Sequence, residues 1–209
     1  MTKALIAYGG TFILSTLLSY RAIASPTEEP LVDIAKVCPG IVIEMRYATR
    51  SNALGHAIYP VDARCLVRAS VGQRLRTAQT FLRTQGAGLK IWDAYRPGWA
   101  QRTLWQLAPN PEFVGNPERG GSLHTWGVAV DVTLVDHLKR ELKMPSEFDD
   151  FSPAAARTYR GSDKLVARNL DMLQRAMTVA GFMVMRDEWW HFVARDYREF
   201  APVDVSLTP

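Results

Sequence analysis

The sequence contains few of the residues that bind metals or cross-link chains, so each of them is informative. Its 209 residues include only four histidines and two cysteines. No close C-x-x-C pair is present, which excludes a zinc site built on cysteine pairs. The sequence also lacks internal repeats and low-complexity segments, which excludes solenoid and low-complexity proteins.

Excess charge of either sign is small. The formal net charge is +4, but Lys3 and Arg21 precede residue 25, which leaves 23 of the 25 basic residues against 21 acidic ones. The basic residues are scattered and form no stripe with aromatic residues, so we expect no nucleic-acid partner. A hydrophobic content of 47% with 22% charged residues is typical of one globular domain of this length.

No hydrophobic run is long and unbroken enough to predict a membrane span. The apolar stretch after Lys3 is interrupted by polar residues and glycines, and "AIA" at 22–24 fits a cleavage site. We therefore predict a signal peptide over 1–24 and a mature domain over 25–209 that begins at Ser25. The alternative is an uncleaved N-terminal anchor. Export predicts a periplasmic protein, with no membrane contact beyond the signal, and the sequence leaves its oligomeric state open.

Export also permits a disulfide between Cys38 and Cys65. Such a bond would close a loop of about 27 residues and contribute roughly 3 kcal/mol. Two separate buried thiols are the favoured alternative, because Cys65 lies in "ARCLVRA" before a predicted helix and nothing places Cys38 beside it.

Hydrophobic periodicity predicts an α+β fold, with one domain in which helices flank a mainly antiparallel sheet. The predicted strands are 41–49, 89–95, 128–135, 182–185 and 189–193. Three helices are predicted. The first spans 66–85 and ends at Gly86, and its inward residues are Val71, Leu75, Ala78 and Leu82. The second spans 99–108, and the third is capped by Ser162 and ends at Gly181, with Leu165, Leu170, Leu173 and Met177 inward. Irregular segments are predicted at 51–64, 109–121 and 139–162.

The stretch "GGSLHTWGVAVDVTL" (120–134) holds His124 and Asp131, seven positions apart. Residues seven apart in a regular strand face opposite sides, so a shared site requires a turn near Gly127. A carboxylate inside an apolar strand needs a partner, and a metal ion is the strongest candidate. A histidine satisfied within the core is the alternative.

A second set of candidates follows 60 residues later in "RDEWWHF", which holds Glu188 and His191. A catalytic zinc site needs three protein ligands and a nearby carboxylate to accept a proton from water. His124, Asp131 and His191 as ligands, with Glu188 as the base, supply that set. His56 and His137 are predicted to be surface residues.

These residues carry a family resemblance. "SLHTWGVAVD" resembles the S-x-H-x-x-G-x-A-x-D motif of zinc D-alanyl-D-alanine peptidases, and "EWWH" resembles their E-x-W-H motif. "IEMRYAT", "ARCLVR", "DAYRP" and "EFDDF" resemble the D-alanyl-D-alanine dipeptidase branch, which includes the vancomycin-resistance dipeptidases. The resemblance covers about residues 31–195 and implies the fold of these peptidases and of hedgehog-like domains. It implies one Zn²⁺ per chain, held by the three ligands above, with Glu188 as the catalytic base.

The resemblance also implies roles outside the metal site. Arg96 would stabilise the oxyanion of the tetrahedral intermediate. Ser122 and Asp149 are candidates to bind the ammonium of the substrate, although the sequence cannot choose between Asp149 and Asp150. Tyr59, Trp189 and Trp190 are candidates for the pocket wall, with core packing as the alternative for the tryptophans.

The resemblance therefore implies hydrolysis of the dipeptide D-alanyl-D-alanine in cell-wall peptide turnover. An exported enzyme cannot deplete a cytoplasmic precursor, so recycling or nutritional use is expected in place of antibiotic resistance. One alternative is a D,D-carboxypeptidase that trims longer wall peptides, which would require a more open cleft. The other is a non-catalytic zinc module, against which the presence of both Glu188 and Arg96 argues.

Overall fold

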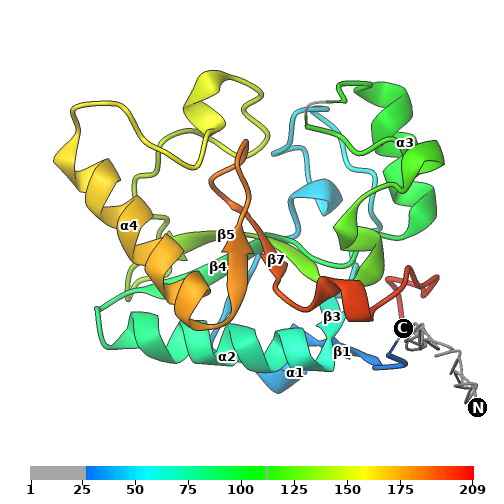
Figure 1. Cartoon of the computed structure of the whole chain (residues 1–209), viewed down its shortest axis with the longest axis horizontal. Coiled ribbons are helices and arrows are strands. Elements are labelled where there is room, and N and C mark those ends of the chain that lie inside the picture. Colours follow the sequence, from blue (N-terminus) through cyan, green and yellow to red (C-terminus); the bar gives the residue numbers. More distant parts are fainter. Residues whose placement is uncertain (1–26, 112) are drawn as a thin grey trace, which may run out of the picture.

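The computed structural model of the chain, shown in Figure 1, describes residues 27–111 and 113–209. The strands are β1 (Leu31–Asp33), β2 (Val42–Ile43), β3 (Leu66–Arg68), β4 (Gly88–Asp93), β5 (Ala129–Val135), β6 (Phe182–Val184) and β7 (His191–Ala194). The α-helices are α1 (Ile34–Val37), α2 (Ala69–Arg83), α3 (Gly98–Leu107) and α4 (Lys164–Val179). Short 3₁₀ helices are η1 (Arg46–Ala48), η2 (Pro117–Arg119), η3 (Leu123–Trp126), η4 (Pro153–Ala155) and η5 (Tyr197–Glu199).

The predicted signal peptide over 1–24 and the predicted start at Ser25 lie outside the described residues. Among the helices that the structure does describe, none combines the length and the apolar character needed to cross a bilayer.

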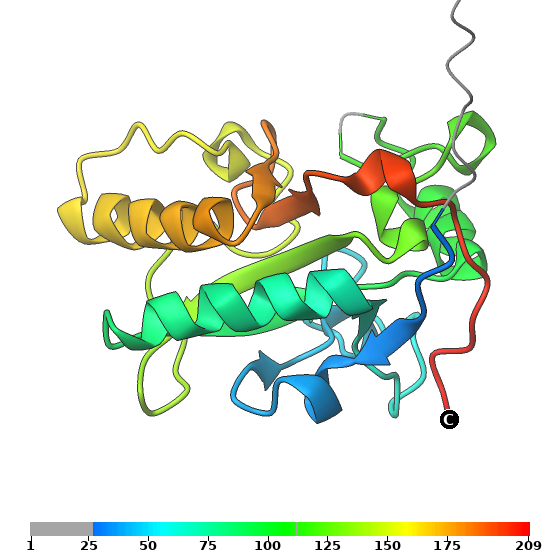
Figure 2. The same cartoon turned by 60° about the horizontal axis from the view of Figure 1, so that its bottom comes forward.

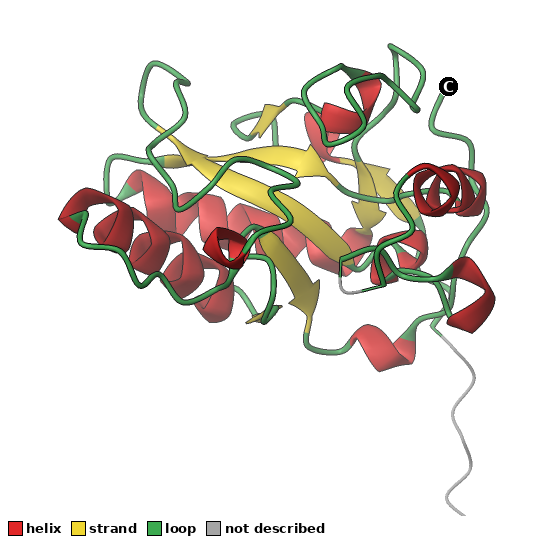
Figure 3. Cartoon of the chain, turned by 90° about the horizontal axis from the view of Figure 1, so that it is seen from above, coloured by secondary structure: helices red, strands yellow, loops and turns green. Residues whose placement is uncertain are grey.

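A five-stranded sheet with the order β2-β4-β5-β7-β6 forms the centre of the fold. Three of its four strand pairs are antiparallel and only β2–β4 is parallel, so the predicted α+β fold is confirmed. Helices α2 and α4 lie side by side on one face of this sheet (Figures 1 and 2). Long loops cross the other face, as the view in Figure 3 shows.

Alternation along β5 gives the sheet one apolar and one polar face. Val130, Val132 and Leu134 are fully buried in the hydrophobic core. Asp131 and Thr133 alternate with them and therefore point to the face that the loops cover. The central strand thus carries a carboxylate into the interior of the protein, on the side away from α2 and α4.

The two long helices follow the predicted periodicity, with corrections at their starts. The four predicted inward residues of α2 are fully buried, and Gly86 has a φ of 74° just beyond its end. However, Leu66–Arg68 forms β3, because it pairs with β1 instead of continuing the helix. In α4 the carboxylate of Asp163, not Ser162, accepts hydrogen bonds from the amides of the first turn.

One of the four predicted inward residues of α4 is wrong. Val166 is buried, whereas the predicted inward residue Leu165 is 51% exposed. Val166, Leu170, Leu173 and Met177 form the regular 4-3-4 spacing from the observed start of the helix. The predicted end at Gly181 is confirmed by its φ of 89°.

The strand predicted at 41–49 is much shorter than expected, and the one predicted at 189–193 begins two residues later. Only residues 42 and 43 of the predicted strand 41–49 pair with β4, and the chain then turns into η1. This turn places Tyr47 under the loops on the polar face of the sheet. Trp189 and Trp190 precede β7 instead of belonging to it, and both are almost completely buried.

Both cysteines are buried, and neither forms a disulfide. Burial raises the pKa of the Cys65 thiol and, less strongly, that of Cys38. The prediction of two separate buried thiols is therefore confirmed.

Candidate active site

Strand register places three ionisable residues in one row across the sheet. Asp131 on β5 lies directly opposite His191 on β7, and Asp93 on β4 lies opposite Asp131 on its other side. Residues directly opposite each other in an antiparallel pair point to the same face. The row therefore lies on the face that the loops cover.

A tight turn before β5 brings His124 to the same row. Ser122 caps η3 by accepting a hydrogen bond from the amide of His124, and Gly127 ends η3 with a φ of 72°. A Cβ atom on Gly127 would lie 2.5 Å from a methyl carbon of Leu31, so the leucine side chain would have to shift, and the positive φ would strain the backbone of any other residue. The predicted turn at Gly127 is confirmed.

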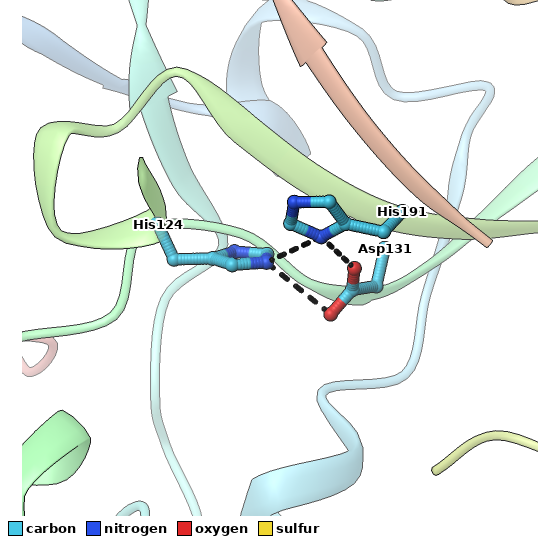
Figure 4. A group of neighbouring side chains, drawn as sticks. All are labelled: His124, Asp131 and His191. Carbon is cyan, nitrogen blue, oxygen red and sulfur yellow. Dashed lines mark hydrogen bonds and ion pairs between the residues drawn. The ribbon is translucent and has the colours of Figure 1, made fainter. Parts of the chain in front are cut away.

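His124, Asp131 and His191 converge on one point, as Figure 4 shows. The His124 Nε2 to His191 Nδ1 distance is 3.1 Å, and the Asp131 carboxylate lies 3.4 Å from the first nitrogen and 2.8 Å from the second. Ligands at the roughly 2.0–2.1 Å typical of zinc–nitrogen bonds stand about 3.3 Å apart in a tetrahedron. The three side chains therefore fit a tetrahedral metal ion, and His124, Asp131 and His191 are called the metal-binding set below.

The surroundings of His124 and Asp131 prepare them to bind a cation. The Nδ1 of His124 donates to the carbonyl oxygen of Ala94 at 2.6 Å, which leaves the Nε2 lone pair directed at the site. Burial acts to raise the pKa of Asp131, but the two histidines outweigh it and hold the pKa well below its ordinary value. Asp131 is therefore an anion inside the protein.

Glu188 lies in the turn before β7, with a carboxylate oxygen 3.9 Å from Nδ1 of His191. Burial raises its pKa from 4.5 to about 8, and the negative charges of Asp131 and Asp149 act in the same direction. A carboxyl group with a pKa near neutrality can both accept and return a proton. Glu188 is thus beside the three metal-binding side chains without being one of them.

Arg96 is held in place by buried partners that the sequence analysis did not identify. Its Nε and Nη2 donate to one oxygen of Asp93 at 2.9 and 2.7 Å, and its Nη1 donates to Gln101 at 2.8 Å. The other oxygen of Asp93 accepts a hydrogen bond from the Tyr59 hydroxyl at 2.8 Å. The guanidinium lies 4.0 Å from Asp131, so its charge is fixed next to the metal-binding set.

Asp149, and not Asp150, belongs to this site. It is 8% exposed and accepts hydrogen bonds from the Tyr47 hydroxyl and the Ala53 amide, both at 3.2 Å. Its φ of 58° is unusual for a residue with a side chain and turns it inward. Asp150 lines a separate surface depression with Glu141 and Glu147.

Burial raises the pKa of Asp149 from 3.8 to about 7, and the nearby Asp131 adds to the effect. Arg96 and the two hydrogen bonds act in the opposite direction without cancelling it. The charged form of a carboxyl group buried in this way is stabilised by any cation that binds beside it.

The metal-binding set, Glu188, Arg96, Ser122 and Asp149 all line one cavity of about 200 Å³. Pockets for drug-sized molecules are usually roughly 300–1,000 Å³, so this cavity suits a smaller ligand. Its apolar wall consists of Leu104, Phe113, Val114, Leu123, Phe151 and Met185.

The structure separates this set from other candidate residues. Trp189 and Trp190 pack in the hydrophobic core, as their alternative interpretation predicted, and Tyr59 acts through Asp93 instead of lining the cavity. His56 and His137 are exposed, as expected. Asp93 belongs to the site but was not singled out in the sequence. Its position there was a usable signal, because it is an acid at the end of the buried strand "LKIWD".

Comparison with known proteins identifies relatives of this chain. Residues 27–201 match the family model described as D-Ala-D-Ala dipeptidase, a span that includes all seven candidate site residues. The D-alanyl-D-alanine dipeptidase of Escherichia coli K12 is 36% identical over 162 residues, covering 78% of this chain and 83% of that protein. The D-alanyl-D-alanine dipeptidase of Enterococcus faecalis V583 is 31% identical over 173 residues, covering 73% of this chain and 85% of that protein.

Among solved structures, a zinc complex of the vancomycin-resistance D,D-pentapeptidase VanY is similar, with a TM-score of 0.40 and 14% identity. The similarity covers 62% of this chain and 72% of that chain. The match over residues 27–201 and the dipeptidase relatives are decisive. The chain therefore belongs to the D-Ala-D-Ala dipeptidase family of peptidases.

Proposed function

We propose that this protein is a zinc-dependent dipeptidase that hydrolyses free D-alanyl-D-alanine to two molecules of D-alanine. One observation supports this most directly: the small cavity that contains the metal-binding set also contains the buried carboxylate of Asp149. A dipeptide carries its free ammonium one residue before the scissile bond. A carboxyl group that shares a small cavity with a metal site can bind this ammonium, which favours a dipeptide over a longer chain.

His124, Asp131 and His191 would hold the zinc ion, because their three donor groups fit its preferred tetrahedral arrangement. Zinc bound by these residues supplies Lewis acidity, which lowers the pKa of a water molecule and polarises a carbonyl oxygen. We propose one ion per chain, since these three residues form one site.

The residues around this site perform the remaining steps. Glu188 accepts the proton of the attacking water and then donates it to the leaving nitrogen, because its carboxylate lies beside the three candidate ligands without being one of them. Arg96 uses three of its five N–H groups on Asp93 and Gln101, which leaves two to stabilise the oxyanion. Asp149, with Ser122 nearby, binds the ammonium of the substrate.

The test is hydrolysis of three substrates by the purified, zinc-loaded protein: D-Ala-D-Ala, N-acetyl-D-Ala-D-Ala and a cell-wall pentapeptide ending in D-Ala-D-Ala. We expect release of D-alanine from the free dipeptide only. Equal hydrolysis of the pentapeptide would replace the dipeptidase by a D,D-carboxypeptidase. Zinc binding without hydrolysis of any of the three would indicate a non-catalytic metal module.

Substitution of Asp149 by asparagine should lower kcat/KM for the free dipeptide by about 10–150-fold, the equivalent of a charge-assisted hydrogen bond worth roughly 1.5–3 kcal/mol. Asp150→Asn is the matched control, because that neighbouring carboxylate lies outside the cavity. The measurement is kcat/KM for the free dipeptide in both variants by steady-state kinetics. Equal losses in the two variants would show that Asp149 has no special role.

The same substitution should change the pH dependence of stability. The pKa of Asp149 is about 7 in the metal-free fold against an ordinary value of 3.8. Its contribution to the free energy of unfolding should therefore fall as the pH rises from about 4 to about 7, by at most about 4 kcal/mol at 1.36 kcal/mol for each pKa unit. Relative to wild type, metal-free Asp149→Asn should become more stable over that range. Urea unfolding at pH 4 and pH 8 measures the free energy of unfolding of both proteins. If the difference between variant and wild type were the same at the two pH values, the raised pKa of Asp149 would be contradicted.

We also propose that the protein is exported, and that it recycles dipeptide released during cell-wall turnover. The charge and cleavage pattern of residues 1–24 support this proposal. Mass spectrometry of protein from a periplasmic fraction should give a chain that begins at Ser25. An intact Met1 on protein confined to the cytosol would contradict both export and the recycling role.

A further inference from the structure

Two phenylalanines from separate loops stack against each other at the cavity. Phe113 belongs to the segment between α3 and η3, and Phe151 belongs to the long segment between β5 and α4. Their ring centroids are 4.9 Å apart and the ring planes differ by 29°. Both side chains line the cavity that contains the metal-binding set.

The position of this pair differs from that of the residues deeper in the cavity. Arg96, His124 and Asp131 are buried, whereas both phenylalanine rings are half-buried. Phe151 packs against the edge of the hydrophobic core, and Phe113 is not part of that core. The stacked rings therefore lie between the interior of the cavity and the solvent.

The pair also joins the two segments that hold the proposed ammonium-binding groups. Phe151 follows Asp149 by two residues, and Phe113 lies in the segment that leads to Ser122. Gln101 anchors this second segment by donating to the carbonyl oxygen of Gly115 at 2.6 Å, so the backbone beside Phe113 is held to α3. The rings thus lie on the side of the cavity where the amino end of the substrate would bind.

A stacked aromatic pair contributes only about 0.5–1.5 kcal/mol beyond its burial. That is enough to keep two loops together most of the time and weak enough for them to separate when a substrate enters. Neither ring carries a group that could take part in peptide hydrolysis, so their contribution is to the shape of the site.

We propose that Phe113 and Phe151 form an aromatic gate that limits the substrate to an unextended amino end. This gate rests on the proposed dipeptidase function, because it needs the ammonium of the substrate to lie near Asp149. It determines specificity by excluding atoms attached beyond the substrate nitrogen. Asp149 selects for charge at that nitrogen, and the gate selects for lack of bulk.

The two selections can be separated with N-benzyl-D-Ala-D-Ala, which keeps the positive charge of the amine and adds bulk. We would compare kcat/KM for this compound and for D-Ala-D-Ala in wild type, Phe113→Ala and Phe151→Ala. The kcat/KM for N-benzyl-D-Ala-D-Ala divided by the kcat/KM for D-Ala-D-Ala should rise by roughly tenfold or more in each variant, because removal of either ring removes the steric exclusion. The double variant should give about the same ratio as the single ones, since one missing ring already opens the gate.

Phe81→Ala is the matched control, because Phe81 is also half-buried but lies on α2, across the sheet from the cavity. Its ratio should equal that of wild type. A ratio that is unchanged in both gate variants, with circular dichroism showing that they are folded, would overturn the gate while the dipeptidase function stands.

A binding measurement separates failure of the gate from failure of the proposed function. Calorimetry on zinc-loaded protein carrying Glu188→Gln gives dissociation constants for both compounds without turnover, with and without the gate substitutions. If wild type hydrolyses neither compound, the proposed function fails, and a larger gain in N-benzyl binding in the gate variants still supports the gate. Failure of every variant to bind either compound would overturn both proposals.

Discussion

Glu188→Gln should abolish dipeptide hydrolysis while the protein keeps its zinc. The glutamine has nearly the same shape but cannot accept a proton, and Glu188 is adjacent to the metal-binding set without belonging to it. Loss of a general acid–base typically lowers the rate by roughly 10²–10⁴-fold, and this residue is proposed to act in both proton transfers. The measurement is kcat together with the zinc content of the purified variant.

Glu147→Gln provides the control for Glu188. Glu147 is an exposed carboxylate in the same half of the chain and lines a different surface depression. Its substitution should leave kcat within the error of the assay. If Glu188→Gln retained near-normal turnover with zinc bound, another group would have to activate the water, and the proposed mechanism would be wrong.

His191→Ala should lose both the metal and the activity. Removal of a residue that hydrogen-bonds to a metal ligand usually lowers the affinity for the metal by roughly 10–100-fold. Removal of one of three direct ligands should lower it more. Zinc at 100 times its dissociation constant should stabilise wild type by about 2.7 kcal/mol, an effect the variant should lack. Thermal unfolding with and without zinc reports this independently of catalysis.

His56→Ala serves as the matched control, because His56 is exposed and distant in sequence from the metal-binding set. It should retain the zinc content of wild type and the same gain in Tm on adding zinc. Full zinc occupancy in His191→Ala would remove His191 from the ligand set and require a different third ligand.

The parts of this site that could be predicted from the sequence are those with a local signal. His124, Gly127 and Asp131 lie within eight residues. A regular strand would place His124 and Asp131 on opposite faces, so the two could share a site only if the chain turned at the glycine. Glu188 and His191 form a similarly compact group. Long periodic helices were predicted for the same reason, since their inward residues repeat at fixed spacing.

Contacts between distant segments could not be predicted in this way. The pairing of Arg96 with Gln101 depends on how α3 leaves the end of β4, and the stacking of Phe113 on Phe151 depends on the paths of two irregular loops. Asp149 and Asp150 have the same chemistry, and the φ of 58° at Asp149 with its hydrogen bonds to Tyr47 and Ala53 distinguishes the two in the fold. Tertiary geometry decided each of these cases.

The row of Asp93, Asp131 and His191 across three strands has a consequence for the order of events in folding. These residues come together only when the β4–β5 and β5–β7 registers are both correct, and a slip of one residue would turn a side chain to the opposite face. The nascent chain therefore has no three-ligand site until β7, near its C-terminal end, has joined the sheet. On the zinc and export proposals above, metal capture would be a late step that requires a correctly assembled sheet, and the exported chain would acquire its ion in the compartment in which it folds.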